Sequence, residues 1–173
     1  MSSPDRAGRP LARRRSLLTL GLLAAVAAPG CGFRLRRAAK LEFQSIALSG
    51  FALRSPMETE LRRQLAYSVK IVDTPAQADV VLLALTDARE RSVVASTSSA
   101  EVRELQLRVR LNFRAVTPTG RQLLAAAELA LSRDLTYSEN AALAKEHEEA
   151  ELFRNMQADV AAQVLRRLAA IRL

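Results

Sequence analysis

Residues 101–116 read EVRELQLRVRLNFRAV, and this stretch decides the fold. Apolar side chains occupy every second position from Leu105 to Ala115, and polar or charged side chains fill the positions between them. Successive side chains of a β-strand point to opposite faces of its sheet. The period of two therefore predicts a long strand with one buried and one solvated face.

The same alternation continues on the C-terminal side of this strand. Residues 117–120 read TPTG, which is a typical turn sequence. Residues 123–131 then alternate again between apolar and polar or small side chains. Two alternating runs joined by four residues predict an antiparallel hairpin.

The N-terminal side of the long strand is apolar and then polar. Residues 78–85 read ADVVLLAL, and their apolar side chains on both faces are typical of a central, doubly covered strand, which we expect to continue to about Arg91. Residues 92–100 (SVVASTSSA) would then join two strands as a loop. This loop is either a mobile tip that contacts a partner or an ordinary hairpin end. The candidate contact residues are Ser92, Val93, Val94, Ser96, Thr97 and Ser98.

Two helices are predicted. Ser55, Pro56 and Glu58 form an S-x-x-E capping box with Pro at the first helical position, and this helix should end near Tyr67. The second helix spans residues 138–170, with Ser138 or Asn140 as its cap. Its apolar residues recur at steps of three and four, and they are Phe153, Met156, Val160, Val164 and Leu168.

These elements predict an α+β fold in the order β-α-β-β-β-α. The first strand is residues 44–48, and residues 69–72 are a short extended piece outside this order. The expected architecture is a two-layer sandwich, with two helices packed on one face of a four-stranded mixed sheet. We expect residues 43–173 to form this single domain.

The N-terminus has the features of an export signal that ends at a lipid site. Basic residues precede an apolar run at residues 17–28, which is shorter than the roughly 20 residues of a membrane span, so residues 1–30 are predicted to be a removed signal peptide. The small residues before Cys31 predict lipid attachment to its thiol, with residues 31–42 as a lipidated tether. Gly32 in place of an aspartate favours the outer membrane. The route of export is either the general one or the twin-arginine one.

Composition argues against several functions. Residues 1–30 contribute +4 of the net charge of +8, so the rest of the chain is only mildly basic. The seven aromatic residues include no Trp, so we expect no nucleic-acid partner.

The chain has one Cys and one His, too few for a Cys/His zinc set, and a Ser-His-Asp triad would need His147 from a strongly charged helix. Glutamates at 146, 148, 149 and 151 lack the spacing of a calcium loop. We therefore predict no catalytic residue, no metal and no cofactor apart from the lipid on Cys31.

Basic side chains supply the remaining candidates for binding. Arg108, Arg110 and Arg114 lie on one face of the long strand, where guanidinium groups either bind phosphate or carboxylate or form a solvated surface. Lys145 either binds a ligand or pairs with Glu149 four residues later.

Several segments together resemble the LptE family of lipopolysaccharide-assembly lipoproteins of the Gram-negative outer membrane. The most specific are residues 31–36 (CGFRLR), 142–146 (ALAKE) and 163–168 (QVLRRL). The resemblance implies a two-layer α/β domain inside the lumen of the LptD β-barrel. There the domain would plug the barrel, assist its assembly and bind lipopolysaccharide on the periplasm-facing side of the outer membrane.

The resemblance also implies which residues contact lipopolysaccharide. One basic residue of the family matches Lys145, whereas a second belongs to the loop before the long strand, which here carries no Lys or Arg. Arg91, close to that loop, and Arg133, at the end of the last strand, are the further candidates. The alternative function is that of a stand-alone periplasmic lipid carrier without a barrel partner, which a large apolar cavity would favour.

Overall fold

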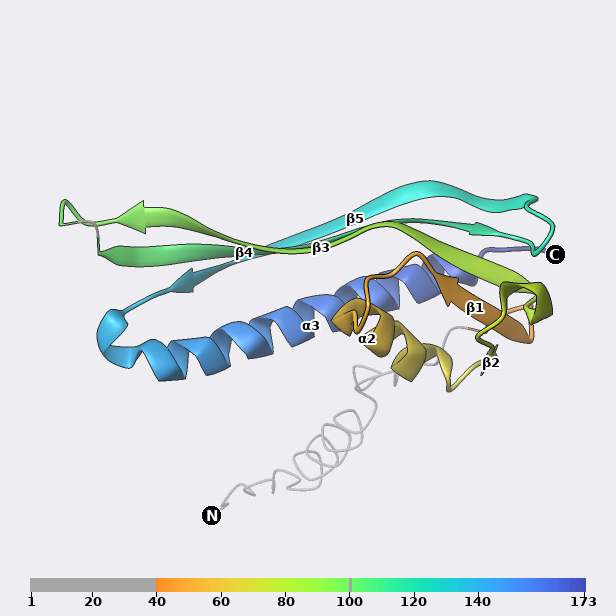
Figure 1. Cartoon of the computed structure of the whole chain (residues 1–173), viewed down its shortest axis with the longest axis horizontal. Helices are drawn as coiled ribbons and strands as arrows, with labels where there is room; N and C mark the ends of the chain where they lie inside the picture. Colours follow the sequence, from red (N-terminus) through yellow and green to blue (C-terminus); the bar gives the residue numbers. More distant parts are fainter. Residues whose placement is uncertain (1–39, 100) are drawn as a thin grey trace, which may run out of the picture. The chain divides into compact units, whose positions relative to one another are not determined.

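The computed structural model describes residues 40–99 and 101–173, which form one mixed sheet with helices on one of its faces (Figure 1). The predicted signal peptide and the lipid site at Cys31 lie outside the described residues. The strands are β1 (Ser45–Ser49), β2 (Lys70–Ile71), β3 (Val80–Ser96), β4 (Val102–Val116) and β5 (Gln122–Thr136). The helices are α2 (Pro56–Leu65) and α3 (Ala142–Leu168), with short 3-10 turns η2 (Pro75–Gln77) and η3 (Glu139–Ala141).

The sheet has five strands in the order β2-β1-β3-β4-β5, so the prediction of four strands was wrong. The additional strand is β2, which lies within the short extended piece and pairs in parallel with β1. The amide of Lys70 donates to the carbonyl of Gln44 at 2.9 Å, and that of Val72 donates to Ile46 at 2.9 Å. Two residues are too few to show a periodicity, so only the pairing with β1 reveals this strand.

Strand β3 extends five residues beyond the expected limit at Arg91. Most of the predicted loop of residues 92–100 is therefore strand, because its first part pairs with the start of β4. Register shifts at Val93, Ala95 and Ser96 interrupt the alternation there, so the sequence pattern does not indicate a strand. The turn itself begins at Thr97, whose amide donates to the carbonyl of Glu101 at 2.9 Å.

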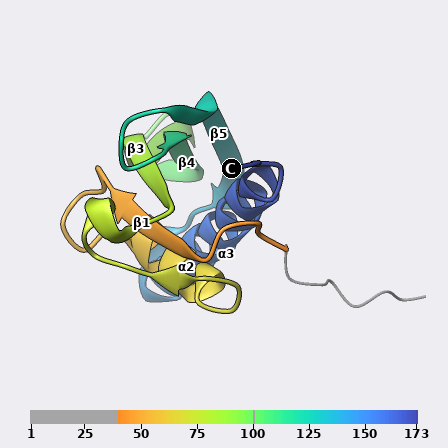
Figure 2. The ribbon, with the colours of Figure 1, turned by 90° about the vertical axis from the view of Figure 1, so that its right-hand side faces the viewer.

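The main core lies between the sheet and the two helices, which cover the same face (Figure 2). The apolar face of β4 is at most 1% exposed and consists of Leu105, Leu107, Val109, Leu111, Phe113 and Ala115. All five apolar residues predicted for the buried stripe of α3 are buried, as are Met57, Leu61 and Leu65 of α2. Burial of each large apolar side chain contributes about 1.5–3 kcal/mol, so this layer stabilises the domain.

A small second core covers the other face of the sheet near the start of β3. Its buried members are Ala47, Ala78, Val81 and Val116. The start of β3 is therefore covered on both faces, as its apolar sequence predicted. Leu85 is an exception, because it lies at a register shift in β3 and is 52% exposed.

The N-termini of the two helices differ from their predicted caps. Ser55 does cap α2, since its hydroxyl accepts a hydrogen bond from the Glu58 amide at 3.0 Å, but the Glu58 side chain binds Arg62 instead of completing the capping box. Neither Ser138 nor Asn140 caps α3. The 3-10 turn η3 precedes α3, and its own backbone bond from the amide of Ala141 to the carbonyl of Ser138 replaces a side-chain cap.

Asp79 joins β1 to the start of β3. Its carboxylate accepts hydrogen bonds from the amides of Gln44 and Ser45 at 2.9 Å each, and its own amide donates to the Ser45 hydroxyl at 2.9 Å. The bond from the Gln44 amide, together with those from Ser45, lowers the pKa of Asp79 below its ordinary value. The charged carboxylate therefore stabilises this junction at neutral pH.

The part of the chain that the structure describes contains no helix with both the length and the apolar character of a membrane span.

Gly50 lets β1 pass close to β3, and replacing it tests this close approach. Its φ is +81°, and a Cβ on it would lie 2.3 Å from the carbonyl oxygen of Ala84. Gly120 provides the matched control, because its φ is +90° but a Cβ there would meet no atom within 4 Å. We expect Gly120→Ala to cost about 1 kcal/mol of unfolding free energy from backbone strain alone, and Gly50→Ala to cost at least about 2 kcal/mol more. Urea unfolding followed by circular dichroism measures both, and equal losses would contradict the close approach.

Candidate functional site

A register shift in β3 decides which of its side chains face the helices. Before the shift, Leu82 and Ala84 point into the main core. The shift between Ala84 and Thr86 moves the alternation by one residue, so Arg89 and Arg91 pair with buried residues of β4 and face the helices. Two cations therefore reach the helix-facing side of the sheet.

The candidates Arg91 and Arg133 lie in one row across the sheet. Both pair with Leu107 of β4, Arg91 from β3 and Arg133 from β5. Paired residues on neighbouring strands share a face, so both arginines lie on the helix-facing side, with Cα atoms roughly 10 Å apart.

Lys145, the third candidate, lies in the first turns of α3. Its ammonium group is 2.8 Å from the Glu148 carboxylate, three residues later, instead of pairing with Glu149. Glu149 pairs with Arg91 at 3.4 Å. Because Lys145 is one helical turn from the partner of Arg91, the fold brings Lys145, Arg91 and Arg133 to the same end of the sheet.

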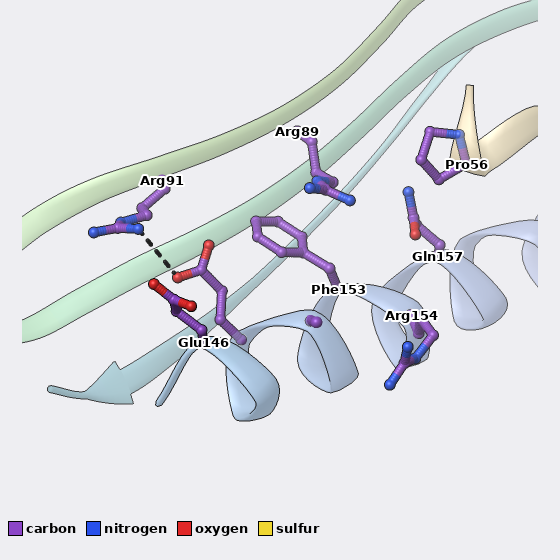
Figure 3. Close-up of a pocket in the computed structure, with 9 residues that line it drawn as sticks. Pro56, Arg89, Arg91, Glu146, Phe153, Arg154 and Gln157 are labelled. Atoms are coloured by element: carbon purple, nitrogen blue, oxygen red, sulfur yellow. Dashed lines mark hydrogen bonds and ion pairs between the residues drawn. The ribbon is translucent and has the colours of Figure 1, made fainter. Parts of the chain in front are cut away.

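A groove of about 370 Å³ lies next to this basic row, between β3 and α3 (Figure 3). The guanidinium carbon of Arg89 lies 4.4 Å from the ring centroid of Phe153, which is the geometry of a cation–π contact. The lining residues are Pro56, Arg89, Arg91, Glu146, Glu149, Ala150, Phe153, Arg154 and Gln157. The groove is thus lined by positively and negatively charged side chains together with apolar ones.

A second groove of about 390 Å³ adjoins the first, between α2 and α3. It shares Pro56, Arg154 and Gln157 with the first groove and adds Arg54, Thr59 and Glu60. Arg54 has a φ of +61°, a conformation that is uncommon for a side chain of its size. We call the two connected spaces the double groove.

Hydrogen bonds from α2 hold the walls of the double groove. The buried hydroxyl of Ser55 donates to the Asp87 carboxylate of β3 at 2.5 Å while it caps α2. The side-chain amide of Gln64 donates to the carbonyl of Ala158 in α3 at 3.1 Å. The start of α2 is therefore attached to both neighbouring elements.

The predicted contact loop lies apart from the double groove. Ser92, Val93, Val94 and Ser96 belong to β3, and only Thr97 and Ser98 are in the turn of the hairpin. Val93 and Val94 are about half exposed, and the hairpin projects past the start of α3 (Figure 1). Its contact with a partner stays a prediction.

The second predicted arginine set lies on the opposite face of the sheet. Arg110 pairs with Glu90 at 2.8 Å, and Arg108 donates to the Gln106 side chain at 3.2 Å. Both contacts fit the interpretation of Arg108, Arg110 and Arg114 as a solvated face, separate from the basic row.

Residues 40–99 and 101–173 contain no group of three His, Cys, Asp or Glu side chains able to hold a metal ion. His147 is exposed on α3.

Sequence reasoning missed Arg89 and Gln157. For Gln157 a signal was available, because it follows Phe153 by four residues and precedes Val160 by three, so a polar residue interrupts the apolar stripe of α3. For Arg89 the signal was hidden by the register shift in β3, which no local pattern reveals.

A family model and a relative of known family agree on one family, and two solved structures share the fold. The family model described as LptE, lipopolysaccharide-assembly, matches residues 38–168. The LPS-assembly lipoprotein LptE of Pectobacterium atrosepticum is 30% identical over 165 residues, which cover 91% of this chain and 88% of that protein. The solution structure of lipoprotein B from Nitrosomonas europaea is 26% identical with a TM-score of 0.67 and covers 80% of this chain and 91% of its own. The rare lipoprotein B from Shewanella oneidensis is also 26% identical, with a TM-score of 0.60 and coverages of 73% and 95%.

The contact between Ser55 and Asp87 can be tested by a double-mutant cycle. Ser55→Ala removes both the helix cap and the bond to β3, and we expect a loss of about 1–2 kcal/mol in unfolding free energy. Ser132→Ala, at an exposed position of β5, should change stability by less than about 0.5 kcal/mol. Asp87→Asn is the second change of the cycle. Urea unfolding of the single and double variants should give a coupling free energy between Ser55 and Asp87 of about 0.5 kcal/mol or more. If the losses simply add, the two side chains do not interact.

Proposed function

The chain belongs to the LptE family of lipopolysaccharide-assembly proteins, and from this membership we propose how its surfaces serve that role. It is an outer-membrane lipoprotein that occupies the lumen of an LptD-type β-barrel, assists the folding of that barrel and binds lipopolysaccharide during delivery to the cell surface. The lipid on Cys31 anchors it, and residues 31–42 connect the anchor to the domain. No catalytic step is assigned to it.

The convergence of Arg91, Arg133 and Lys145 carries the lipopolysaccharide part of the proposal. Phosphate groups of lipid A are anionic, and guanidinium groups bind phosphate through paired N–H donors. The ion pair of Arg91 with Glu149 is long, at 3.4 Å, and half of the Arg91 side chain is exposed, so exchanging this partner for a phosphate costs little.

Arg133 can take the place of the basic residue that the hairpin turn lacks. The turn carries Thr97, Ser98 and Ser99, without a cation. Arg133 lies on the neighbouring edge strand and on the same face as Arg91, so we assign it the second phosphate contact.

The solvated face of the sheet supports the barrel part of the proposal. The polar side of β4 and its neighbours on β3 and β5 carry Arg108, Arg110, Glu90 and Asp134 in mixed charge. A plug needs such a surface, because the inside of a large barrel is polar. The alternative of a lipid carrier has less support, since the double groove is open and lined by charged side chains.

Charge reversal in the basic row tests the lipopolysaccharide contact. We expect Lys145→Glu, Arg91→Glu and Arg133→Glu each to weaken binding of purified lipopolysaccharide at least about tenfold at low salt, since each replaces an attraction by a repulsion. Arg108→Glu, an exposed position on the opposite face, is the matched control and should bind as the unchanged chain does. Far-UV circular dichroism should be the same for all four variants. A variant that binds like the unchanged chain removes that residue from the site.

Co-purification tests the barrel partner. The tagged mature chain, extracted from outer membranes in mild detergent, should recover a large β-barrel in a one-to-one complex that mass spectrometry identifies. Recovery of the chain alone, or with lipid only, would overturn the plug function and favour the lipid carrier.

A further inference from the structure

Gln157 is a buried polar side chain at the centre of the double groove. It is 5% exposed, yet it lines both spaces. Figure 3 shows it rising from α3 beside Pro56 and Phe153. Within the described ranges 40–99 and 101–173, the side-chain atoms that are fully buried without a hydrogen-bond partner belong to Arg110 and Asn112, so the Gln157 amide is not enclosed in the core. It lies at the wall that the two spaces share, where a group that enters the groove can reach it.

The chemistry of an amide limits what that group can be. The Gln157 side chain offers one acceptor and an N–H donor close together. A peptide group of an extended chain presents the complementary donor and acceptor along one edge. Gln157 can therefore pair with the main chain of a bound segment, which an acyl chain does not provide.

The charges around Gln157 indicate the side chains of such a segment. The guanidinium group of Arg89 lies over the ring of Phe153, which cannot accept all of its N–H donors, so donors stay available for a carboxylate. Arg154 lies on the other side of Gln157, at the boundary of the two spaces, and forms an exposed ion pair with Glu151. Either arginine can bind an acidic side chain in bidentate geometry.

The shape of the double groove also fits a polypeptide. Two open spaces of about 370 and 390 Å³ meet across Pro56, at the start of α2. Glu146 and Glu149 line one of them and can pair with a basic side chain. An extended peptide carries main-chain donors and acceptors as well as charged side chains, so it can use the donors, acceptors and both charges that line the two spaces.

We propose that the double groove binds an extended polypeptide segment, whose main chain pairs with Gln157 and whose acidic side chain meets Arg89 or Arg154. The segment belongs to a protein partner. This inference rests on the proposed function and deepens it by stating which surface receives a loop of that partner. The double groove shares Arg91 with the basic row assigned to lipopolysaccharide, whereas Gln157, Arg89 and Arg154 belong to the groove alone.

A selection from random peptides tests the inference. Phage-displayed peptides are selected on the immobilised mature chain in mild detergent, and enriched peptides are synthesised for titration. Binding is measured for the unchanged chain, Gln157→Leu, Arg89→Gln and the control Arg108→Gln. Thermal unfolding of each variant checks the fold. Arg89 is exposed, so Arg89→Gln keeps the test decisive even if Gln157→Leu unfolds.

We expect the enriched peptides to contain Asp or Glu. They should bind Gln157→Leu and Arg89→Gln about tenfold more weakly than the unchanged chain, which is a loss of about 1.4 kcal/mol in binding free energy. Binding to Arg108→Gln should not change. Replacing the peptide's acidic residue by its amide should have the same effect. Enrichment without acidic residues, no enrichment, or equal binding by the folded groove variants would overturn the inference. Since no barrel is present, this result is independent of the co-purification that tests the proposed function.

Discussion

The antiparallel pairing of β4 with β3 on one side and β5 on the other is the constraint from which the functional surfaces follow. This pairing determines the face of every residue on the three long strands. The apolar side of β4 is buried against α3, so the register cannot slip by one residue without moving that whole set into solvent. Once the register is determined, Arg91 and Arg133 lie on one side of the sheet and Arg108 and Arg110 on the other.

The register shift at Ala84 and Thr86 gives this arrangement its asymmetry. Without it, the alternation of the first part of β3 would place Ala88 and Glu90 towards the helices. With it, Asp87, Arg89 and Arg91 occupy that side, where Asp87 receives the Ser55 hydroxyl and Arg91 receives Glu149. One additional residue in a strand therefore places Asp87, Arg89 and Arg91 on the helix-facing side instead of Ala88 and Glu90.

The helix-facing side of the sheet is divided along its length. On β3 this side is apolar near β1 and α2 and charged towards the start of α3, whereas β4 stays apolar and buried throughout. Gln157 is the polar member of the buried stripe of α3. Its amide supplies a hydrogen-bonding group at the wall that the two spaces of the double groove share. The mixed charge beside it stays partly solvated, which keeps the energetic cost of the ion pairs low.

Local signals in the sequence determined the elements whose features repeat along the chain. The alternation of β4 and β5, the cap at Ser55 and the buried stripe of α3 were all predicted, because each depends on residues a few positions apart. Only the tertiary structure decided the parts that depend on pairing between distant segments. These are strand β2, the extension of β3 to Ser96, the partner of Lys145 and the convergence of Arg91 with Arg133. The physical reason is that hydrogen-bond register and side-chain packing are set by neighbours far away in the chain, and a register shift leaves no periodic trace in composition.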